Sequence, residues 1–159
     1  MQQLNNTFKI MKNNNILHRD LKLENILIKY NDKEHKIFTI KLADYGSSKK
    51  SDSLSKIYFS SHVGTLYYMA PEILKGEKYN YKCDLWSLGI IIYKLFFGKS
   101  PYSGKTEKSL IKDIDKFGKS LIKKIENKEL DDLIRDLLEV EQKKEVEVSF
   151  EFFNISSFF

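Results

Sequence analysis

The chain has 159 residues and a net charge of +5, from 27 lysines and arginines against 22 aspartates and glutamates. Its 42% hydrophobic residues can form a core, which excludes wholesale disorder, and its single cysteine, Cys83, excludes an intramolecular disulfide. Lysines and acids are interleaved, so we expect a solvated mixed-charge surface and no nucleic-acid partner. The longest apolar run, 85–97, is too short for a membrane span, and the first residues lack the apolar stretch of a secretory signal. We therefore expect an intracellular protein, in the cytoplasm.

The first predicted elements are one helix and two strands. Apolar residues recur at spacings of four and three between Leu4 and Met11, which predicts an amphipathic helix over 2–14. Two short apolar runs, 26–28 and 37–42, are separated by a polar stretch and predict a strand pair joined by a turn.

The rest of the chain is predicted to be a loop followed by helices. The segment 47–62 is rich in serine and lacks periodicity, so we expect a loop. The run 85–97 is apolar nearly all round, which is typical of a helix buried on most faces. Apolar spacing predicts further helices over 106–117 and 129–139, and only weakly over 146–159.

The densest group of reactive side chains lies between the first helix and the first strand. Asp20, Lys22 and Asn25 place a carboxylate, a cation and a carboxamide within six residues. Such a set can accept a hydroxyl proton, neutralise a phosphate oxygen and bind a hard cation, or it can be a solvated polar turn. Asp44 follows the second strand, and a hairpin of this length can bring it back beside Asn25. Two oxygen ligands that converge in this way suit Mg²⁺.

These residues belong to a series of five motifs, which resembles the eukaryotic protein kinase family from residue 1 nearly to residue 159. In chain order the motifs are the catalytic-loop pattern at 18–25, an Asp-Tyr-Gly variant of Asp-Phe-Gly at 44–46, the segment 64–69, Ala70-Pro71-Glu72, and Asp84-Leu85-Trp86-Ser87-Leu88-Gly89. Lys22, two residues after Asp20, together with Gly64-Thr65 resembles the serine/threonine branch of the family.

The resemblance implies an α+β fold that is mainly helical, the C-terminal lobe of a protein kinase. A short β hairpin would carry the catalytic loop and the magnesium-binding loop. Residues 1–159 would form a single partial kinase domain with its activation segment over 44–72. No glycine-rich loop or strand lysine can be located in the sequence, so we expect the N-terminal lobe to be absent.

The implied function is ATP- and Mg²⁺-dependent phosphoryl transfer to serine or threonine hydroxyls of a protein substrate. Because this chemistry depends on positioning and charge, a truncated catalytic lobe is expected to have negligible turnover alone. The alternative is a catalytically inactive kinase-like remnant that acts as a protein-binding module. In either case we expect an exposed apolar surface, which a partner chain could cover.

The resemblance also implies a role for each matching residue. Asp20 and Lys22 would be catalytic, and Lys22, Glu24, Asn25 and Asp44 would bind the cofactor, with Asn25 and Asp44 as the metal ligands. Thr65 would lie in the substrate loop, and Arg19, Glu72 and Asp84 would have regulatory or structural roles, Asp84 by accepting hydrogen bonds from the catalytic-loop backbone.

Two further expectations concern regulation and the end of the chain. A phosphate on the serine-rich loop could pair with Arg19, although a merely flexible loop explains the same serines. The candidate phosphorylation sites are Ser53, Ser55, Ser60 and Ser61. Glu145 stands where the family has an arginine that holds Glu72, so we expect two carboxylates to repel each other there, unless Lys143 or Lys144 replaces the arginine as a point charge.

Overall fold

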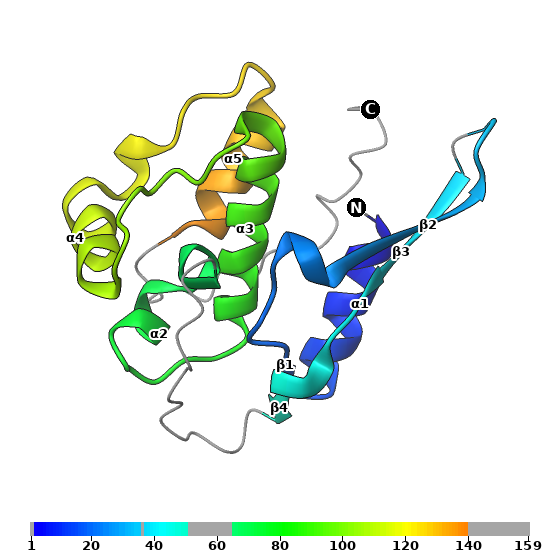
Figure 1. The fold of residues 1–159 in the computed structure, drawn as a ribbon, viewed down its shortest axis with the longest axis horizontal. Coiled ribbons are helices and arrows are strands. Elements are labelled where there is room, and N and C mark those ends of the chain that lie inside the picture. The colour runs from blue at the N-terminus through cyan, green and yellow to red at the C-terminus, as the bar shows by residue number, and fades with distance from the viewer. Residues whose placement is uncertain (1, 36, 51–64, 140–159) are drawn as a thin grey trace.

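The structure is a computed structural model that describes residues 2–35, 37–50 and 65–139. A group of helices forms one part of the molecule, and a hairpin with the first helix forms the other (Figure 1). The helices and strands, in chain order, are α1 (Gln2–Asn13), β1 (Ile16–Leu17), β2 (Ile26–Asp32), β3 (Ile37–Leu42), β4 (Lys49–Lys50), α2 (Pro71–Leu74), α3 (Lys82–Phe97), α4 (Glu107–Phe117) and α5 (Lys128–Leu137). Short 3₁₀ turns are η1 (Leu23–Asn25), η2 (Tyr45–Ser47), η3 (Thr65–Tyr68) and η4 (Gly118–Leu121).

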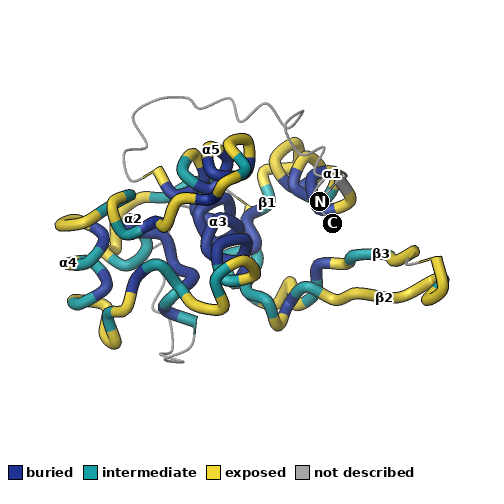
Figure 2. Tube along the Cα trace, turned by 90° about the horizontal axis from the view of Figure 1, so that it is seen from above, coloured by how far each residue is buried: buried dark blue, intermediate teal, exposed yellow. Residues whose placement is uncertain are grey.

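Helix α3 lies at the centre of the helical part and is buried along most of its length (Figure 2). It ends at Gly98, whose φ of 70° lies in the left-handed region that glycine adopts without strain. Helix α5 packs closely against it, because Gly89 has no side chain: a Cβ there would come within 2.9 Å of Leu137 Cβ. Their apolar side chains, including Ile90 and Ile134, are completely buried between them and their neighbours.

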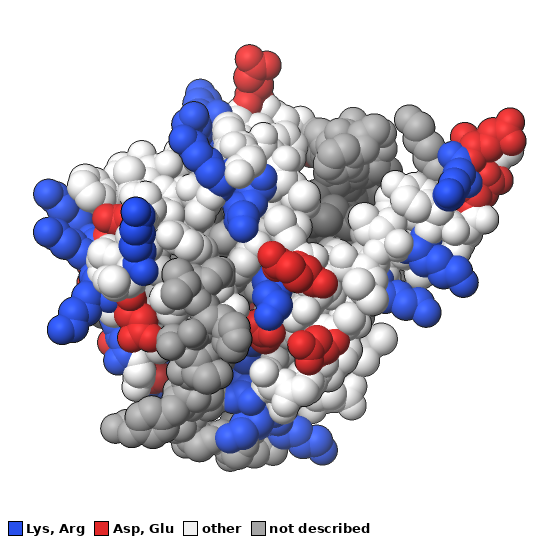
Figure 3. All heavy atoms as spheres, in the orientation of Figure 1, with Lys and Arg blue, Asp and Glu red and all other residues white. Residues whose placement is uncertain are grey.

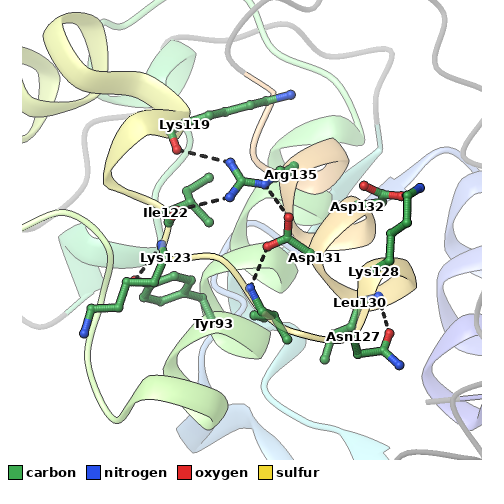
Figure 4. Close-up of polar contacts among 11 residues, drawn as sticks. Tyr93, Lys119, Ile122, Lys123, Asn127, Lys128, Leu130, Asp131, Asp132 and Arg135 are labelled. Carbon is green, nitrogen blue, oxygen red and sulfur yellow. Dashed lines mark hydrogen bonds and ion pairs between the residues drawn. The ribbon is translucent and has the colours of Figure 1, made fainter.

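Polar side chains fix the starts of the last two long helices. Thr106 accepts a hydrogen bond from Ser109 N at 3.2 Å and begins α4 with a capping box. Asn127 accepts one from Leu130 N at 3.0 Å and begins α5. Asp131 in α5 and its neighbours form a network of hydrogen bonds that ties the segment between α4 and α5 to α5 (Figure 4).

Helix α1 buries the apolar stripe that the sequence predicts, with Leu4 and Met11 in the core. Its polar side holds strand β3, since the amide of Gln3 donates to Phe38 O at 3.0 Å and accepts from Ile40 N at 2.8 Å. A single side chain on the helix therefore pairs with two backbone groups at the open edge of the hairpin.

Strands β2 and β3 form an antiparallel hairpin that projects from the rest of the molecule (Figures 1 and 2). Ile26 pairs with Leu42 at its base, and an irregularity in register lies between Tyr30 and Asp32 near its tip. Much of its apolar surface is open to solvent. The exposed side chains are Leu27, Ile28, Tyr30, Ile37 and Phe38. The expected exposed apolar surface is thus present on this hairpin.

Most of the predicted elements are confirmed: the first helix, the strand pair and the helices of 106–117 and 129–139. The prediction of a loop over 47–62 is wrong at its start. Ser47 is the end of η2, and the next residues form β4, which pairs with β1 so that Lys49 lies opposite Leu17. The buried helix begins at Lys82, three residues before its apolar run. The predicted tail helix, 146–159, lies outside the described residues.

Two broad expectations agree with the structure, a mainly helical α+β fold and a surface of mixed charge. The structure is mainly helical with small antiparallel sheets. Lysines and acids are intermixed on the face shown in Figure 3. None of the helices in the described ranges is long and apolar enough to cross a membrane.

Candidate active site

The backbone of the loop that follows β1 is hydrogen-bonded to a side chain at the start of helix α3. The carboxylate of Asp84 accepts hydrogen bonds from His18 N at 2.7 Å and from Arg19 N at 2.8 Å. Burial raises the pKa of the Asp84 carboxyl, and the two backbone N–H groups act against this rise by stabilising the charged form. One acid at the start of α3 thereby fixes the backbone just before Asp20.

Arg19 connects this loop to the segment after β3. Its backbone has a φ of 68°, which is uncommon for a residue with a side chain. Its guanidinium donates from Nε to Ser47 O at 2.6 Å and also from Nη2 to the same oxygen. A weaker bond runs from Nη1 to Tyr79 Oη at 3.4 Å. The serines 53, 55, 60 and 61, the predicted phosphorylation sites, lie outside the described residues.

Asp20, Lys22 and Asn25 form one hydrogen-bonded cluster. Lys22 Nζ donates to Asp20 Oδ2 at 2.7 Å, and Asn25 Nδ2 donates to Asp20 O at 2.8 Å and to Asp20 Oδ2 at 3.3 Å. The pKa of Lys22 is raised, chiefly by its hydrogen bond to Asp20. The charges of Asp44 and Glu24 act in the same direction, so these carboxylates lie close enough to be felt at the Lys22 ammonium.

The hairpin brings the backbone before Asp44 to Asn25. Ala43 N donates to Asn25 O at 2.8 Å, directly beyond the Ile26–Leu42 pair. Asp44 itself is exposed, with a φ of 61°, and its Oδ1 accepts from Gly46 N at 3.3 Å. The predicted return of this strand to Asn25 is therefore observed in the backbone.

His18 and Tyr45 pack around this junction. His18 is fully buried, and its Nε2 lies 3.0 Å from Ala43 O, so this nitrogen carries the proton that is donated. The rings of His18 and Tyr45 lie 5.0 Å apart. Partial burial raises the pKa of the Tyr45 phenol, although the residue as a whole stays 46% exposed. Both rings thus support the turn that precedes and contains Asp44.

The donor set fits a magnesium ion. Asn25 uses its amide nitrogen on Asp20, which leaves its side-chain oxygen available, and Asp44 offers an exposed carboxylate. Hard oxygen donors of this kind are the ligands that Mg²⁺ prefers, with water and phosphate oxygens completing its shell. Within the described ranges, no three His, Cys, Asp or Glu side chains gather into a metal site. Phosphate-assisted binding suits a site of this composition.

Thr65 lies beside the Asp20 loop, whereas Glu72 lies in helix α2. Thr65 starts η3 and lines a small pocket together with Asp20 and Arg19. Glu72 is buried in the first turn of α2. Glu145, which was expected to face it, lies outside the described residues. The structure therefore brings Thr65 to the Asp20 loop and leaves the Glu72 expectation without a test.

Sequence reasoning did not single out the contacts between α3 and η3. Ser87 Oγ donates to Tyr68 O at 2.7 Å, and Lys94 Nζ donates to Tyr68 Oη at 2.8 Å. The available signal was that Ser87 and Lys94 are polar positions in the otherwise apolar run 85–97.

Comparison with known proteins identifies the family. Residues 1–149 match the family model described as "Protein kinase domain". Serine/threonine-protein kinase 33 of Bos taurus is 37% identical over 119 residues, which cover 73% of this chain and 24% of that protein. Calcium-dependent protein kinase 4 of Plasmodium falciparum is 37% identical over 138 residues, 87% of this chain and 25% of that protein. Calcium-dependent protein kinase 4 of Plasmodium berghei is 39% identical over 128 residues, which cover 80% of this chain and 23% of that protein.

This chain belongs to the protein kinase family. It spans about a quarter of the length of each of these three curated relatives.

Proposed function

We propose that residues 1–159 form part of a serine/threonine protein kinase domain, the C-terminal lobe, which holds the catalytic base and the magnesium ligands. The observation that carries the proposal is the hydrogen-bonded cluster of Asp20, Lys22 and Asn25, held against the strand end that leads to Asp44. The names of the relatives as serine/threonine and calcium-dependent protein kinases support the class of acceptor.

In this proposal Asp20 orients the serine or threonine hydroxyl of a protein substrate and accepts its proton. Its Oδ2 is held by Lys22 and Asn25, so the carboxylate is fixed before the substrate arrives. The ammonium of Lys22 lies beside this oxygen and stabilises the negative charge of the transferring group. Removing either partner would leave the carboxylate less well positioned.

Asn25 and Asp44 are the proposed metal ligands, and exposed Glu24 lies on the same turn as Asn25. Bound MgATP supplies the phosphoryl group and a divalent charge that offsets the phosphate oxygens. Asn25 presents its amide oxygen because its nitrogen is engaged by Asp20, and Asp44 is presented by the tight turn at η2.

Thr65 is proposed to act at the substrate loop, over a pocket that Asp20 also lines. Arg19 is proposed to pair with a phosphate group on Ser53, Ser55, Ser60 or Ser61, which belong to the activation segment 44–72. Phosphorylation there would raise activity, and equal activity of phosphorylated and phosphatase-treated protein would contradict this point. We propose an intracellular setting, because ATP and protein substrates are available there.

The test measures binding of ATP to the full chain with and without Mg²⁺. Broadening of the ³¹P NMR lines of ATP reports the binding, because it detects weak complexes. We expect Mg²⁺ to strengthen binding to the wild type, and the variant Asp44→Asn to lose most of this gain. Asp132→Asn, which removes the same charge from an exposed position on α5, is the matched control and should keep it. The absence of any Mg²⁺-dependent difference between the wild type and Asp44→Asn would overturn the proposal.

The exposed hairpin favours a second function, a protein-binding module. Leu27, Ile28 and Ile37 are each more than half exposed on a two-stranded sheet, and such a sheet is marginally stable without a third strand or a covering surface. Leu27 and Ile28 are consecutive and lie on opposite faces of the hairpin, so a partner chain on either face would supply part of the cover. Sedimentation of the wild type and of Ile37→Asp would test it: concentration-dependent association lost in the variant supports the module, and a monomer at every concentration counts against it.

A further inference from the structure

Lys94 is the only charged residue in the apolar run 85–97, and it is partly exposed on the last turn of α3. Its Nζ donates to Tyr68 Oη at 2.8 Å and lies 4.5 Å from the centre of the Tyr68 ring. The hydroxyl and the ring of Tyr68 are both neutral, so they orient the Lys94 ammonium without cancelling its charge.

Tyr68 places this cation beside the proposed substrate loop. It is the last residue of η3, is 3% exposed, and lines the same pocket as Thr65 and Asp20. Helix α3 holds it at both ends, because Ser87 binds its carbonyl oxygen and Lys94 binds its hydroxyl. These two residues are seven positions apart, which puts them on one face of the helix. The position of Lys94 relative to η3 is therefore fixed.

Lys94 does not line the pocket itself and reaches it only through Tyr68, whereas the charged residues that do line it, Arg19, Asp20 and Asp84, already have partners. Asp20 pairs with Lys22, and Asp84 accepts two backbone N–H groups. Arg19 donates to a backbone carbonyl and a tyrosine hydroxyl. Lys94 differs from them, since no carboxylate of the described residues lies within ion-pair distance of its ammonium. A partly buried cation with no carboxylate beside it among the described residues favours contact with an anionic group.

We infer that Lys94 is a specificity-determining residue that selects peptides with an anionic side chain close to the acceptor serine or threonine. The anion is a carboxylate or a phosphate, and a basic side chain at the same place is rejected by like-charge repulsion. The inference rests on the proposed function, because it takes Asp20 as the position of the acceptor hydroxyl.

The experiment measures binding of fluorescent serine peptides to the full chain by anisotropy, without nucleotide. Four peptides differ at one position near the serine, which holds glutamate, phosphoserine, glutamine or lysine. We expect the glutamate peptide to bind about three- to fivefold more tightly than the glutamine peptide, the gain of one partly screened ion pair. The phosphoserine peptide separates the two sources of the anion, because its larger charge should give a larger gain if a phosphate is preferred.

Variants at Lys94 assign the preference to this side chain. Lys94→Met should remove it, Lys94→Glu should reverse it in favour of the lysine peptide, and Lys94→Arg should retain it. Lys108→Glu makes the same charge change on the exposed surface of α4 and is the matched control, expected to leave the preference intact. Because Lys94→Met could alter folding, Lys94→Arg and Lys94→Glu give an assignment that does not depend on it.

An anion preference that persists in Lys94→Met or Lys94→Glu would overturn the inference, and so would equal or absent binding of all four peptides to the wild type. These results are separate from the test of the proposed function. Loss of peptide preference with intact Mg²⁺-dependent ATP binding contradicts only the role of Lys94, whereas loss of ATP binding with an intact preference contradicts only the nucleotide site.

Discussion

Helix α5 and the β2–β3 hairpin are both rich in branched apolar residues, yet they bury them to opposite degrees. Ile134 of α5 is 0% exposed, whereas Ile28 and Ile37 of the hairpin are 55% and 54% exposed. The helix packs on α3, and the hairpin is held to the chain by α1 and by the contacts at its base. The helical part therefore supplies the stability of the fold, and the hairpin carries two of the proposed site residues near its base.

The largest expected effect compares the same substitution in the two regions. Ile134→Ala should destabilise the protein by about 2–5 kcal/mol, because it removes a buried side chain and leaves a cavity. Ile28→Ala removes an exposed one and should change the free energy of unfolding by less than about 0.5 kcal/mol. Urea unfolding monitored by circular dichroism measures both.

Similar losses for the two variants would contradict this division. Such a result would mean that the hairpin face is covered in solution, and it would favour the protein-binding module. A concentration dependence of the Ile28→Ala unfolding midpoint would identify that cover as a second copy of the chain.

The second effect concerns the link between the two regions, Asp84. In Asp84→Asn the side-chain amide presents an NH₂ group to one of the backbone N–H donors of His18 and Arg19, so one buried bond is lost. We expect a loss of about 1–3 kcal/mol in the free energy of unfolding. The amide NMR signals of His18 and Arg19 should shift in the variant, and unchanged signals with unchanged stability would show that Asp84 does not brace this loop.

The sequence predicts the helices well because burial imposes a period that can be counted. Leu130, Leu133, Ile134 and Leu137 recur at helical spacing and are buried as expected. The β1–β4 pair could not be predicted in the same way, since two-residue strands are too short to show a period.

The candidate site shows a similar contrast. Its motifs name Asp20, Lys22 and Asn25, whose side chains form a cluster in the structure. The bond from Arg19 to Ser47 O was not predictable, because every residue offers a carbonyl oxygen and only the folded chain decides which one is near. The contact of Lys94 with Tyr68 likewise depends on tertiary packing.

The smallest effect lies within the helical region, at Asp131 (Figure 4). Its Oδ1 accepts from Ile125 N at 2.9 Å and its Oδ2 accepts from Arg135 Nε at 2.7 Å. Asp131→Asn keeps an acceptor for Ile125 but loses the ion pair, so we expect a loss of about 1 kcal/mol at neutral pH. Asp132→Asn, whose partner Lys128 is 89% exposed, is the matched control and should leave the unfolding midpoint unchanged.

The pH dependence of this loss has a definite sign. The hydrogen bond from Arg135 lowers the pKa of the Asp131 carboxyl below its ordinary value of 3.8 in the folded state. The folded protein thus binds this proton less readily than the unfolded chain, and the stabilisation is present above pH about 4 and lost as the pH falls through the folded-state pKa. Urea unfolding of the wild type and Asp131→Asn should therefore converge in acid. A difference that stays constant from neutral pH into that range would mean that Asp131 stabilises the fold by packing and not by its charge.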